Sequence, residues 1–151
     1  MPDIVDPETR SRMMSGIKGK NTKPELIVRK ALHARGFRYR LHDPKVAGKP
    51  DMVFPKLKAV IFVNGCFWHG HDCYLHKLPA TRTQFWKAKI EGNRQRDDTV
   101  RKTLRDSGWR VLTIWECALR GREKIGLDAV VDRVVGWLPS DADSTEIRGS
   151  A

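Results

Sequence analysis

The chain has 151 residues, 40% of them hydrophobic, which suits one domain with a substantial core. Its 29 Lys and Arg against 18 Asp and Glu give a formal net charge of +11, so a polyanionic partner, nucleic acid first, is favoured over a basic protein without one. The N-terminal residues are polar and no apolar run approaches the roughly 20 residues that span a bilayer, so we expect no signal peptide, no membrane partner and a cytosolic or nucleoid-associated protein.

Two helices are predicted in the N-terminal quarter of the chain. The first is capped by Asp6, has Pro7 at its first helical position, and leads into a basic loop. The second begins at the capping box Thr22-Lys23-Pro24-Glu25 and ends at Gly36.

Three strands and a long helix are predicted next. Residues 37–41 alternate in hydrophobicity, and the short apolar runs 52–54 and 59–63, joined by a Pro-Lys-Leu turn, indicate a hairpin. Residues 81–107 are mainly helical, with a break expected at Gly92-Asn93.

The C-terminal part contains the clearest buried strand, residues 109–116 (WRVLTIWE), and a last helix over residues 122–137. The acidic segment 140–151 is expected to be disordered. The order of elements predicts an α/β fold in a single domain, residues 1–139, in which helices flank a central mixed β-sheet.

Three cysteines in a reducing compartment favour metal binding or free thiols over disulfides. Four thiol and imidazole side chains make the obvious ligand set for a tetrahedral zinc site: Cys66, His71, Cys73 and Cys117. Pairing of strand 109–116 with strand 59–63 would bring Cys117 beside Cys66. Spacing alone leaves His69 or His76 as alternatives to His71, and buried cysteines without a metal as another interpretation.

A single acid, Asp51, follows a Gly-Lys-Pro turn and precedes a strand. A carboxylate at such a place can hold Mg²⁺, which in a basic nucleic-acid binder predicts metal-assisted phosphodiester hydrolysis. His69 is a candidate general acid or base, because imidazole titrates near neutral pH. The alternatives are a plain turn residue at Asp51 and a supporting or exposed histidine at His69. Glu25 is explained by the capping box, a role that does not prevent it from facing the same site.

Aromatic side chains occur among cations. Phe67 and Trp68 lie inside the cysteine loop, and Trp86 begins the next helix between Arg82 and Lys87. Rings in such places stack on bases or wedge between base pairs. Apolar side chains of the first helix would do the same from the opposite groove of the duplex. They are Met13, Met14 and Ile17. Core packing is the alternative for all of them.

Four segments together resemble the very-short-patch repair (Vsr) DNA mismatch endonuclease family. They are G-x-P-D-x-V at 48–53, V-I-F-V-N-G-C-F-W-H-x-H-x-C at 60–73, P-A-T-R-T-x-F-W at 79–86 and G-W-R-V-L-x-x-W-E-C-A-L-R-G-R at 108–122. The resemblance covers residues 9–137 without a detectable gap. It implies a restriction-endonuclease-like fold with one structural zinc, in a bacterial cytoplasmic enzyme.

The activity implied by the resemblance is Mg²⁺-dependent nicking of one strand on the 5′ side of the T in a T·G mismatch, which arises when 5-methylcytosine deaminates. This nick initiates very-short-patch repair. The implied partners are double-stranded DNA with that mismatch, a mismatch-repair accessory protein and DNA polymerase I acting downstream, and we expect the enzyme to be a monomer. A non-enzymatic zinc module that binds nucleic acid and a related nuclease with a non-mismatch substrate are the alternatives.

The resemblance also implies roles for individual residues. Asp51 and the main-chain carbonyl of Val63 would bind Mg²⁺, and His69, supported by Glu25, would be the acid/base group. Well-known members have Thr-His where this chain has Val63-Asn64. A carbonyl ligand survives any side chain. Asn64 cannot titrate, so as a catalytic candidate it would hydrogen-bond a phosphate oxygen.

Zinc and DNA contacts are implied in the same way. Zinc would go to Cys66, His71, Cys73 and Cys117. The rings of Phe67, Trp68 and Trp86 would form a wedge inserted from the major groove, and the DNA-contacting helix within residues 1–20, around Met14, would enter the minor groove.

Overall fold

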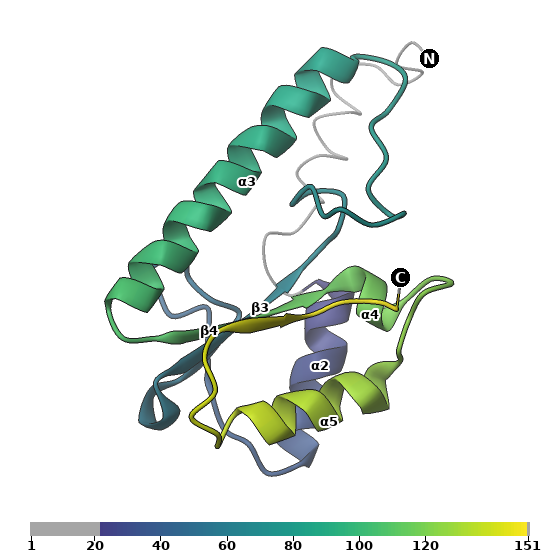
Figure 1. Ribbon diagram of the computed structural model, residues 1–151. Helices are drawn as coiled ribbons and strands as arrows, with labels where there is room; N and C mark the ends of the chain where they lie inside the picture. The colour runs from purple at the N-terminus through teal and green to yellow at the C-terminus, as the bar shows by residue number, and fades with distance from the viewer. Residues whose placement is uncertain (1–21, 151) are drawn as a thin grey trace.

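The computed structural model describes residues 22–150, so the predicted N-terminal helix with Met13, Met14 and Ile17 lies outside the described residues (Figure 1). Five strands form one sheet in the order β1-β2-β3-β4-β5: β1 Arg40–Leu41, β2 Met52–Phe54, β3 Ala59–Asn64, β4 Arg110–Trp115 and β5 Thr145–Ile147. The helices are α2 Lys23–Ala34, η1 Pro55–Leu57 (a 3₁₀ turn), α3 Thr83–Asp106, α4 Glu116–Leu119 and α5 Leu127–Trp137.

The sheet is mixed, as predicted. Strands β1, β2 and β3 pair antiparallel, which confirms the hairpin around η1. Strand β4 lies parallel to β3, and β5 parallel to β4. Helix α3 makes the crossover from β3 to β4, so the segment after β3 and the start of α3 lie beyond the same end of the sheet (Figure 1).

Helices cover both faces of the sheet. Helices α2 and α5 lie on one face, where Val28 and Leu32 meet Val130, Val134 and the apolar side chains of the strands. The C-terminal half of α3 packs on the other face through Leu104. The N-terminal half of α3 rises away from the sheet, beside the loop that follows β3 (Figure 1). That rising half and the loop build the upper part of the molecule.

The predicted start of α2 is confirmed. The Thr22 side chain accepts a hydrogen bond from the Glu25 N–H at 3.4 Å, which satisfies one of the free amide groups at the helix start. Pro24 occupies the first turn, and Gly36, in the left-handed region with φ of 94°, follows the end of the helix. The cap therefore fixes the position of Glu25 in the first turn of α2, where its side chain is buried.

Three predicted boundaries are wrong. Helix α3 runs without a break through Gly92-Asn93, because packing of its apolar stripe outweighs the ~1 kcal/mol helix penalty of one glycine. The strand expected over 37–41 is only Arg40–Leu41. The last helix begins at Leu127 rather than at 122, because α4 turns the chain directly after β4.

The prediction that residues 140–151 are disordered is also wrong for the described residues 140–150. Strand β5 pairs with the free edge of β4 and buries Ile147 to 3% exposure. Arg148 Nη1 lies 2.8 Å from Asp72 Oδ1. Backbone pairing and one apolar anchor order a segment whose acidic composition alone favoured disorder, so the domain extends past residue 139. Among residues 22–150, no helix combines the length and apolar character needed to cross a membrane.

Candidate active site and metal centre

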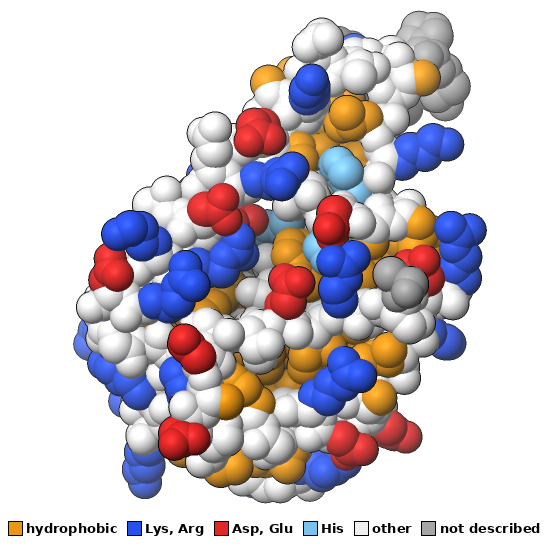
Figure 2. Space-filling view, in the orientation of Figure 1, with side chains coloured by type: hydrophobic (Ala, Val, Ile, Leu, Met, Phe, Trp, Pro, Cys, Tyr) orange, Lys and Arg blue, Asp and Glu red, His pale blue; other side chains and the backbone are white. Residues whose placement is uncertain are grey.

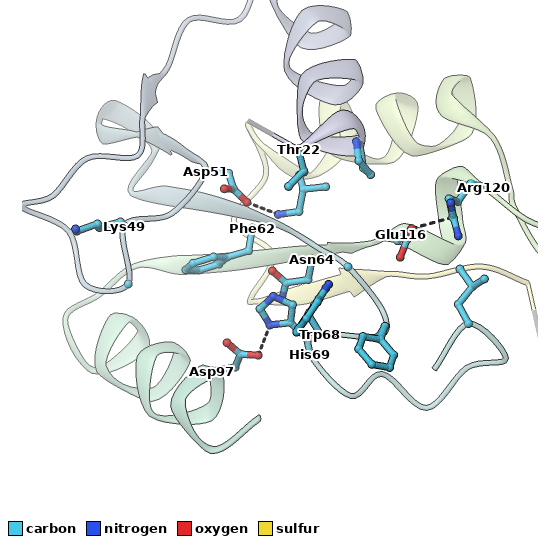
Figure 3. Close-up of a pocket in the computed structure, with 16 residues that line it drawn as sticks. Thr22, Lys49, Asp51, Phe62, Asn64, Trp68, His69, Asp97, Glu116 and Arg120 are labelled. Atoms are coloured by element: carbon cyan, nitrogen blue, oxygen red, sulfur yellow. Dashed lines mark hydrogen bonds and ion pairs between the residues drawn. The ribbon is translucent and has the colours of Figure 1, made fainter. Parts of the chain in front are cut away.

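A cavity of about 590 Å³ opens at the end of the sheet where β3 stops. It is lined from α2, the loop before β2, the end of β3, the cysteine loop and α3, and its polar side chains include Asp51, Asn64, His69 and Asp97 (Figure 3). In the space-filling view, histidine side chains lie beside α3, and both basic and acidic side chains lie on the surface around them (Figure 2). The cavity lining carries charges of both signs, from Lys49 and Arg120 and from Asp51, Asp97 and Glu116.

Asp51 is held in the cavity wall by β3. Its Oδ2 accepts a hydrogen bond from the Val63 N–H at 2.7 Å, and the residue is 8% exposed. Burial raises the pKa of Asp51 to about 8; the Glu25 carboxyl adds to this, while the Val63 N–H and the Arg29 guanidinium act in the opposite direction. A buried carboxyl that resists ionisation in the free protein is poised to exchange its proton for a cation.

Glu25, in the first turn of α2, faces this site. Its side chain is 1% exposed, and its Oε2 lies 2.8 Å from Arg29 Nη1 and 2.8 Å from His42 Nε2. Ligand atoms of Glu25, His42 and Asp51 all lie within 4.8 Å of one another. Two carboxyl groups this close, one of them holding a proton, are a donor set that fits a divalent cation such as Mg²⁺.

His69 is oriented by a residue that the sequence analysis missed. Its Nδ1 lies 2.6 Å from Asp97 Oδ2 on α3, and a dashed line marks this pair in Figure 3. A signal for Asp97 existed. The helix stripe that includes the buried Ile90 and Leu104 also carries Asp97, which places its carboxylate on the face turned to the rest of the domain.

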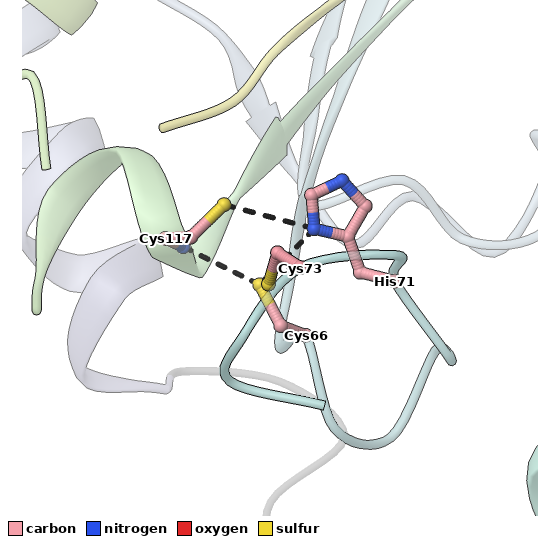
Figure 4. Close-up of side chains that lie close together, drawn as sticks. All are labelled: Cys66, His71, Cys73 and Cys117. Carbon is pink, nitrogen blue, oxygen red and sulfur yellow. Dashed lines mark hydrogen bonds between the residues drawn. The ribbon is translucent and has the colours of Figure 1, made fainter. Parts of the chain in front are cut away.

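The four predicted thiol and imidazole ligands come together in a second site (Figure 4). His71 Nδ1 lies 3.5 Å from Cys66 Sγ and 3.6 Å from Cys117 Sγ. A tetrahedron with zinc–sulfur bonds of about 2.3 Å and zinc–nitrogen bonds of about 2.0–2.1 Å has nitrogen–sulfur edges of roughly 3.5 Å. The donor set and its spacing therefore fit a zinc ion. The spacing alternatives, His69 and His76, lie outside the group.

Protonation in this cluster also suits a metal. Burial lowers the pKa of His71, which keeps its ring in the neutral form that binds metals. Burial raises the pKa of the Cys66 and Cys117 thiols, and a bound cation would offset that cost for the thiolates. The loop is fixed to the sheet by the Cys66 N–H, which donates to Glu116 Oε1 at 3.1 Å, and by the Trp115 ring stacked on His71 at 4.0 Å.

The predicted aromatic residues also meet. The ring centroids of Phe67, Trp68 and Trp86 lie 5.2–5.8 Å from one another, edge to face, and all three side chains are half-buried. Phe67 and Trp68 line the cavity. Arg82 and Lys87 are exposed beside them, the Arg82 guanidinium 4.3 Å from the Phe85 ring. These rings are neither core residues nor free surface residues.

Comparison with known proteins agrees with this arrangement. The family model described as DNA mismatch endonuclease Vsr matches residues 2–75. The DNA mismatch endonuclease Vsr of Escherichia coli (strain K12) is 44% identical over 147 residues, which cover 97% of this chain and 94% of that protein. The chain belongs to the Vsr family.

Two further relatives are named as nicking enzymes. The type II nicking enzyme V.XorIIP of Xanthomonas oryzae pv. oryzae is 47% identical over 79% of this chain and 88% of its own length. The type II nicking enzyme V.NmeAIP of Neisseria meningitidis is 44% identical over 81% of this chain and 87% of its own length. The mixed α/β architecture fits the restriction-endonuclease-like fold that the Vsr resemblance implied.

Most of the residues singled out in the sequence therefore surround one region of this Vsr-family protein. Asp51, Val63, Asn64 and His69 line the cavity, and Glu25 stands behind Asp51. Sequence reasoning missed Asp97 and His42. For His42 the signal lay in strand pairing, because the register of β1 with β2 continues to His42 and Asp51.

Proposed function

We propose that this protein nicks one strand of duplex DNA on the 5′ side of the T in a T·G mismatch, by Mg²⁺-dependent hydrolysis, and so initiates very-short-patch repair. Membership of the Vsr family makes it a DNA endonuclease, which is a hydrolase. The observation that carries the finer proposal is a single cavity lined by Asp51, His69 and the rings of Phe67 and Trp68. Cleavage chemistry and base-pair disruption would then act on the same stretch of DNA.

Asp51 and the main-chain carbonyl of Val63 would hold the Mg²⁺. When bound, the cation would neutralise charge on the phosphate and lower the pKa of an attacking water. The Val63 N–H, which donates to Asp51 Oδ2, supports this role because it orients the carboxyl group in the cavity wall. Glu25 would support the site through its buried side chain, and Asn64, buried at the end of β3, would hydrogen-bond a phosphate oxygen.

His69 would transfer a proton. If its Nδ1 carries the hydrogen shared with Asp97, Nε2 is the nitrogen that can accept or donate a proton in the cavity. The contact with Asp97 would also hold the ring in this orientation. A positioned acid/base group of this kind contributes about 10²–10⁴-fold to rate.

The zinc would be structural. Four protein ligands close a tetrahedral site and leave no position for a reacting water, so chemistry belongs to the separate cation at Asp51. Its role would be to hold the loop that carries His69, Phe67 and Trp68. In this way a metal that takes no part in the reaction would fix the geometry of the residues that do.

Recognition of the mismatch would come from the rings. A T·G pair is more weakly stacked than a matched pair, so a wedge of Phe67, Trp68 and Trp86 opens it at a lower cost, by a few kcal/mol at most. The exposed side chains of Arg82 and Lys87 would contact phosphates. A mismatch-repair accessory protein and DNA polymerase I would act downstream of the nick, and the enzyme would work as a monomer in the bacterial cytoplasm.

Nicking of labelled duplexes with a T·G pair in different sequence contexts, with and without Mg²⁺, tests the proposal. The wild-type chain should cut only the T-containing strand of the T·G duplex, and only with the cation. Asp51→Ala should abolish the nick while binding is retained, and the exposed Asp128→Ala on α5 should leave both unchanged. Equal cutting of matched DNA would indicate a different nuclease, and binding without any nick would indicate a non-enzymatic module.

A further inference from the structure

His42 lies opposite Asp51 although the two residues are distant from each other in the sequence. Strands β1 and β2 pair antiparallel, with Arg40 opposite Val53 and Leu41 opposite Met52. The same register carried one residue further places His42 across from Asp51. The hairpin thus delivers an imidazole to the carboxyl group that the proposed mechanism uses for the cation.

The backbone of His42 is in an unusual conformation. Its φ is 48°, in the left-handed region that residues other than glycine rarely adopt. Such a conformation persists where the surrounding structure imposes it, and it is concentrated at functional sites. Here it turns the chain directly after β1, and the side chain, 15% exposed, points to the buried carboxyl groups rather than to solvent.

The ring of His42 reaches both carboxyl groups from one atom. Nε2 lies 2.8 Å from Glu25 Oε2, a hydrogen-bond distance, and 3.6 Å from Asp51 Oδ1. Arg29, one turn later in α2, reaches the same Glu25 oxygen at 2.8 Å. Glu25 Oε2 is therefore held between a cation on its own helix and the ring of His42, directly after β1.

We propose that His42 is a positioning residue of the cleavage centre: its ring N–H, donated to Glu25, holds that carboxylate beside Asp51 so that the pair is arranged for a divalent cation before the cation binds. The inference rests on the proposed function at Asp51. Arg29 alone would draw Glu25 along α2, and the two carboxylates would repel each other once Asp51 gives up its proton. The hydrogen bond from His42 opposes both tendencies.

A donor role fits the geometry better than direct coordination. The 2.8 Å contact is typical of N–H···O⁻ hydrogen bonds, and Nε2 cannot donate to Glu25 and bind a cation at once. Imidazole is also a poor ligand for Mg²⁺, which prefers oxygen. Partners that orient the ligands of a metal typically contribute about 10–100-fold to metal affinity or activity.

The test uses two substitutions at His42 and a control. His42→Asn keeps a residue that tolerates a positive φ but shortens the side chain, so that the donor no longer reaches Glu25. His42→Gln restores an N–H donor as many bonds from Cα as the histidine Nε2. His33→Ala removes an exposed histidine at the end of α2 and is the control.

Cation affinity of the zinc-loaded, DNA-free protein is measured by titration with Mn²⁺, followed by its electron paramagnetic resonance signal. His42→Asn should weaken Mn²⁺ binding about 10–100-fold, His42→Gln should recover most of the loss, and His33→Ala should match the wild type. In nicking assays the Asn variant should lose kcat with little change in KM for DNA, because phosphate and ring contacts are untouched.

Three results would overturn the inference. Wild-type Mn²⁺ affinity in His42→Asn would show that the ring does not organise the pair. A Gln variant no better than the Asn variant would show that donation to Glu25 is not what matters. A ¹⁴N coupling to bound Mn²⁺ that disappears in His42→Gln would make the ring a ligand. Failure of the proposed function can be distinguished from these results. It would appear as normal nicking by Asp51→Ala, or as equal nicking of mismatched and matched duplexes by the wild type.

Discussion

Cys66 and Cys117 are 51 residues apart in sequence, and the Cys117 N–H donates to Cys66 Sγ at 3.3 Å. The parallel register of β3 with β4 explains this contact, because it pairs each residue of β3 with the residue 51 positions later, from Ala59 with Arg110 to Asn64 with Trp115. Two residues beyond the last pair stand the two cysteines. The pairing of the central strands therefore also brings together two of the four residues of the candidate metal site.

Metal removal should unfold the protein. A structural zinc contributes about 10–16 kcal/mol of apparent binding free energy, and the four ligands come from separated segments. We expect one zinc per chain, and loss of both zinc and folded structure in Cys117→Ala, measured by elemental analysis and circular dichroism. His76→Ala, which removes a histidine of the same loop outside the ligand group, should keep the zinc. A well-folded wild-type chain without zinc would contradict this prediction.

The segment that follows β5 should stabilise the same site. The Gly149 N–H donates to Cys117 Sγ at 3.2 Å, and a Cβ on Gly149 would lie 2.6 Å from the Cys117 carbonyl oxygen. Gly149→Ala should therefore lower the melting temperature and speed zinc release to a chelator. Gly136→Ala on the exposed side of α5, where a Cβ meets nothing, should raise the free energy of unfolding by about 0.4–1 kcal/mol. Equal effects of the two substitutions on the melting temperature and on zinc release would show that the contact of Gly149 with Cys117 does not stabilise the site.

Much of this arrangement was readable from the sequence. The Thr22 cap, the hairpin around η1 and the buried strand before Cys117 all follow local rules of capping, turn chemistry and hydrophobic pattern. The candidate metal ligands were found by residue type, and the predicted pairing of the two strands that precede Cys66 and Cys117 brought them together. The local rules also fixed the start of α2, from which Glu25 enters the site.

What escaped prediction depends on contacts between distant segments. The acidic composition around β5 hides a strand that exists only because the edge of β4 is free to pair with it. Asp97 belongs to a polar helix, and its role appears only when α3 is placed against His69. His42 requires the register of a strand of two residues, too short to recognise from hydrophobic alternation. Tertiary packing, not local propensity, decides each of these.

Stability should depend on pH through Asp51. In the folded chain without added cation the pKa of Asp51 is about 8, against an ordinary 3.8, so between these values the folded state keeps a proton that the unfolded state has released. Its contribution to stability is fully present below pH 4 and is lost as the pH rises through 8. Asp51→Asn cannot titrate, so relative to the wild type it should gain stability from pH 5 to pH 8.5. Denaturant unfolding without Mg²⁺ measures this, and parallel pH profiles would contradict it.

The three-ring cluster should govern mismatch preference. Phe67→Ala and Trp68→Ala should lower the affinity for a T·G duplex more than the affinity for a matched duplex, because only the mismatch is opened by the wedge. Trp109→Ala removes a half-buried ring that packs near Val111, away from the cavity, and should lower stability without changing the ratio. Fluorescence anisotropy at fixed salt gives both affinities, since phosphate contacts make each of them salt-dependent. Equal losses on the two duplexes would make Phe67 and Trp68 packing residues.

Asn64 separates proton transfer from phosphate positioning. It is buried at the end of β3 and lines the cavity with His69, but an amide cannot titrate. We expect His69→Ala to lose at least about 10²-fold in kcat, the lower end for an acid/base group, and Asn64→Ala to lose less. Asp97→Asn should fall between them, because the ring remains but loses the carboxylate partner at 2.6 Å that orients it. Asn64→His should be tolerated and should add a titrating group near pH 6.5 to the pH–rate profile, measured by single-turnover nicking. If Asn64→Ala were as damaging as His69→Ala, the amide itself would be central to catalysis, and His69 would not be the only group in the described part of the cavity on which the reaction depends.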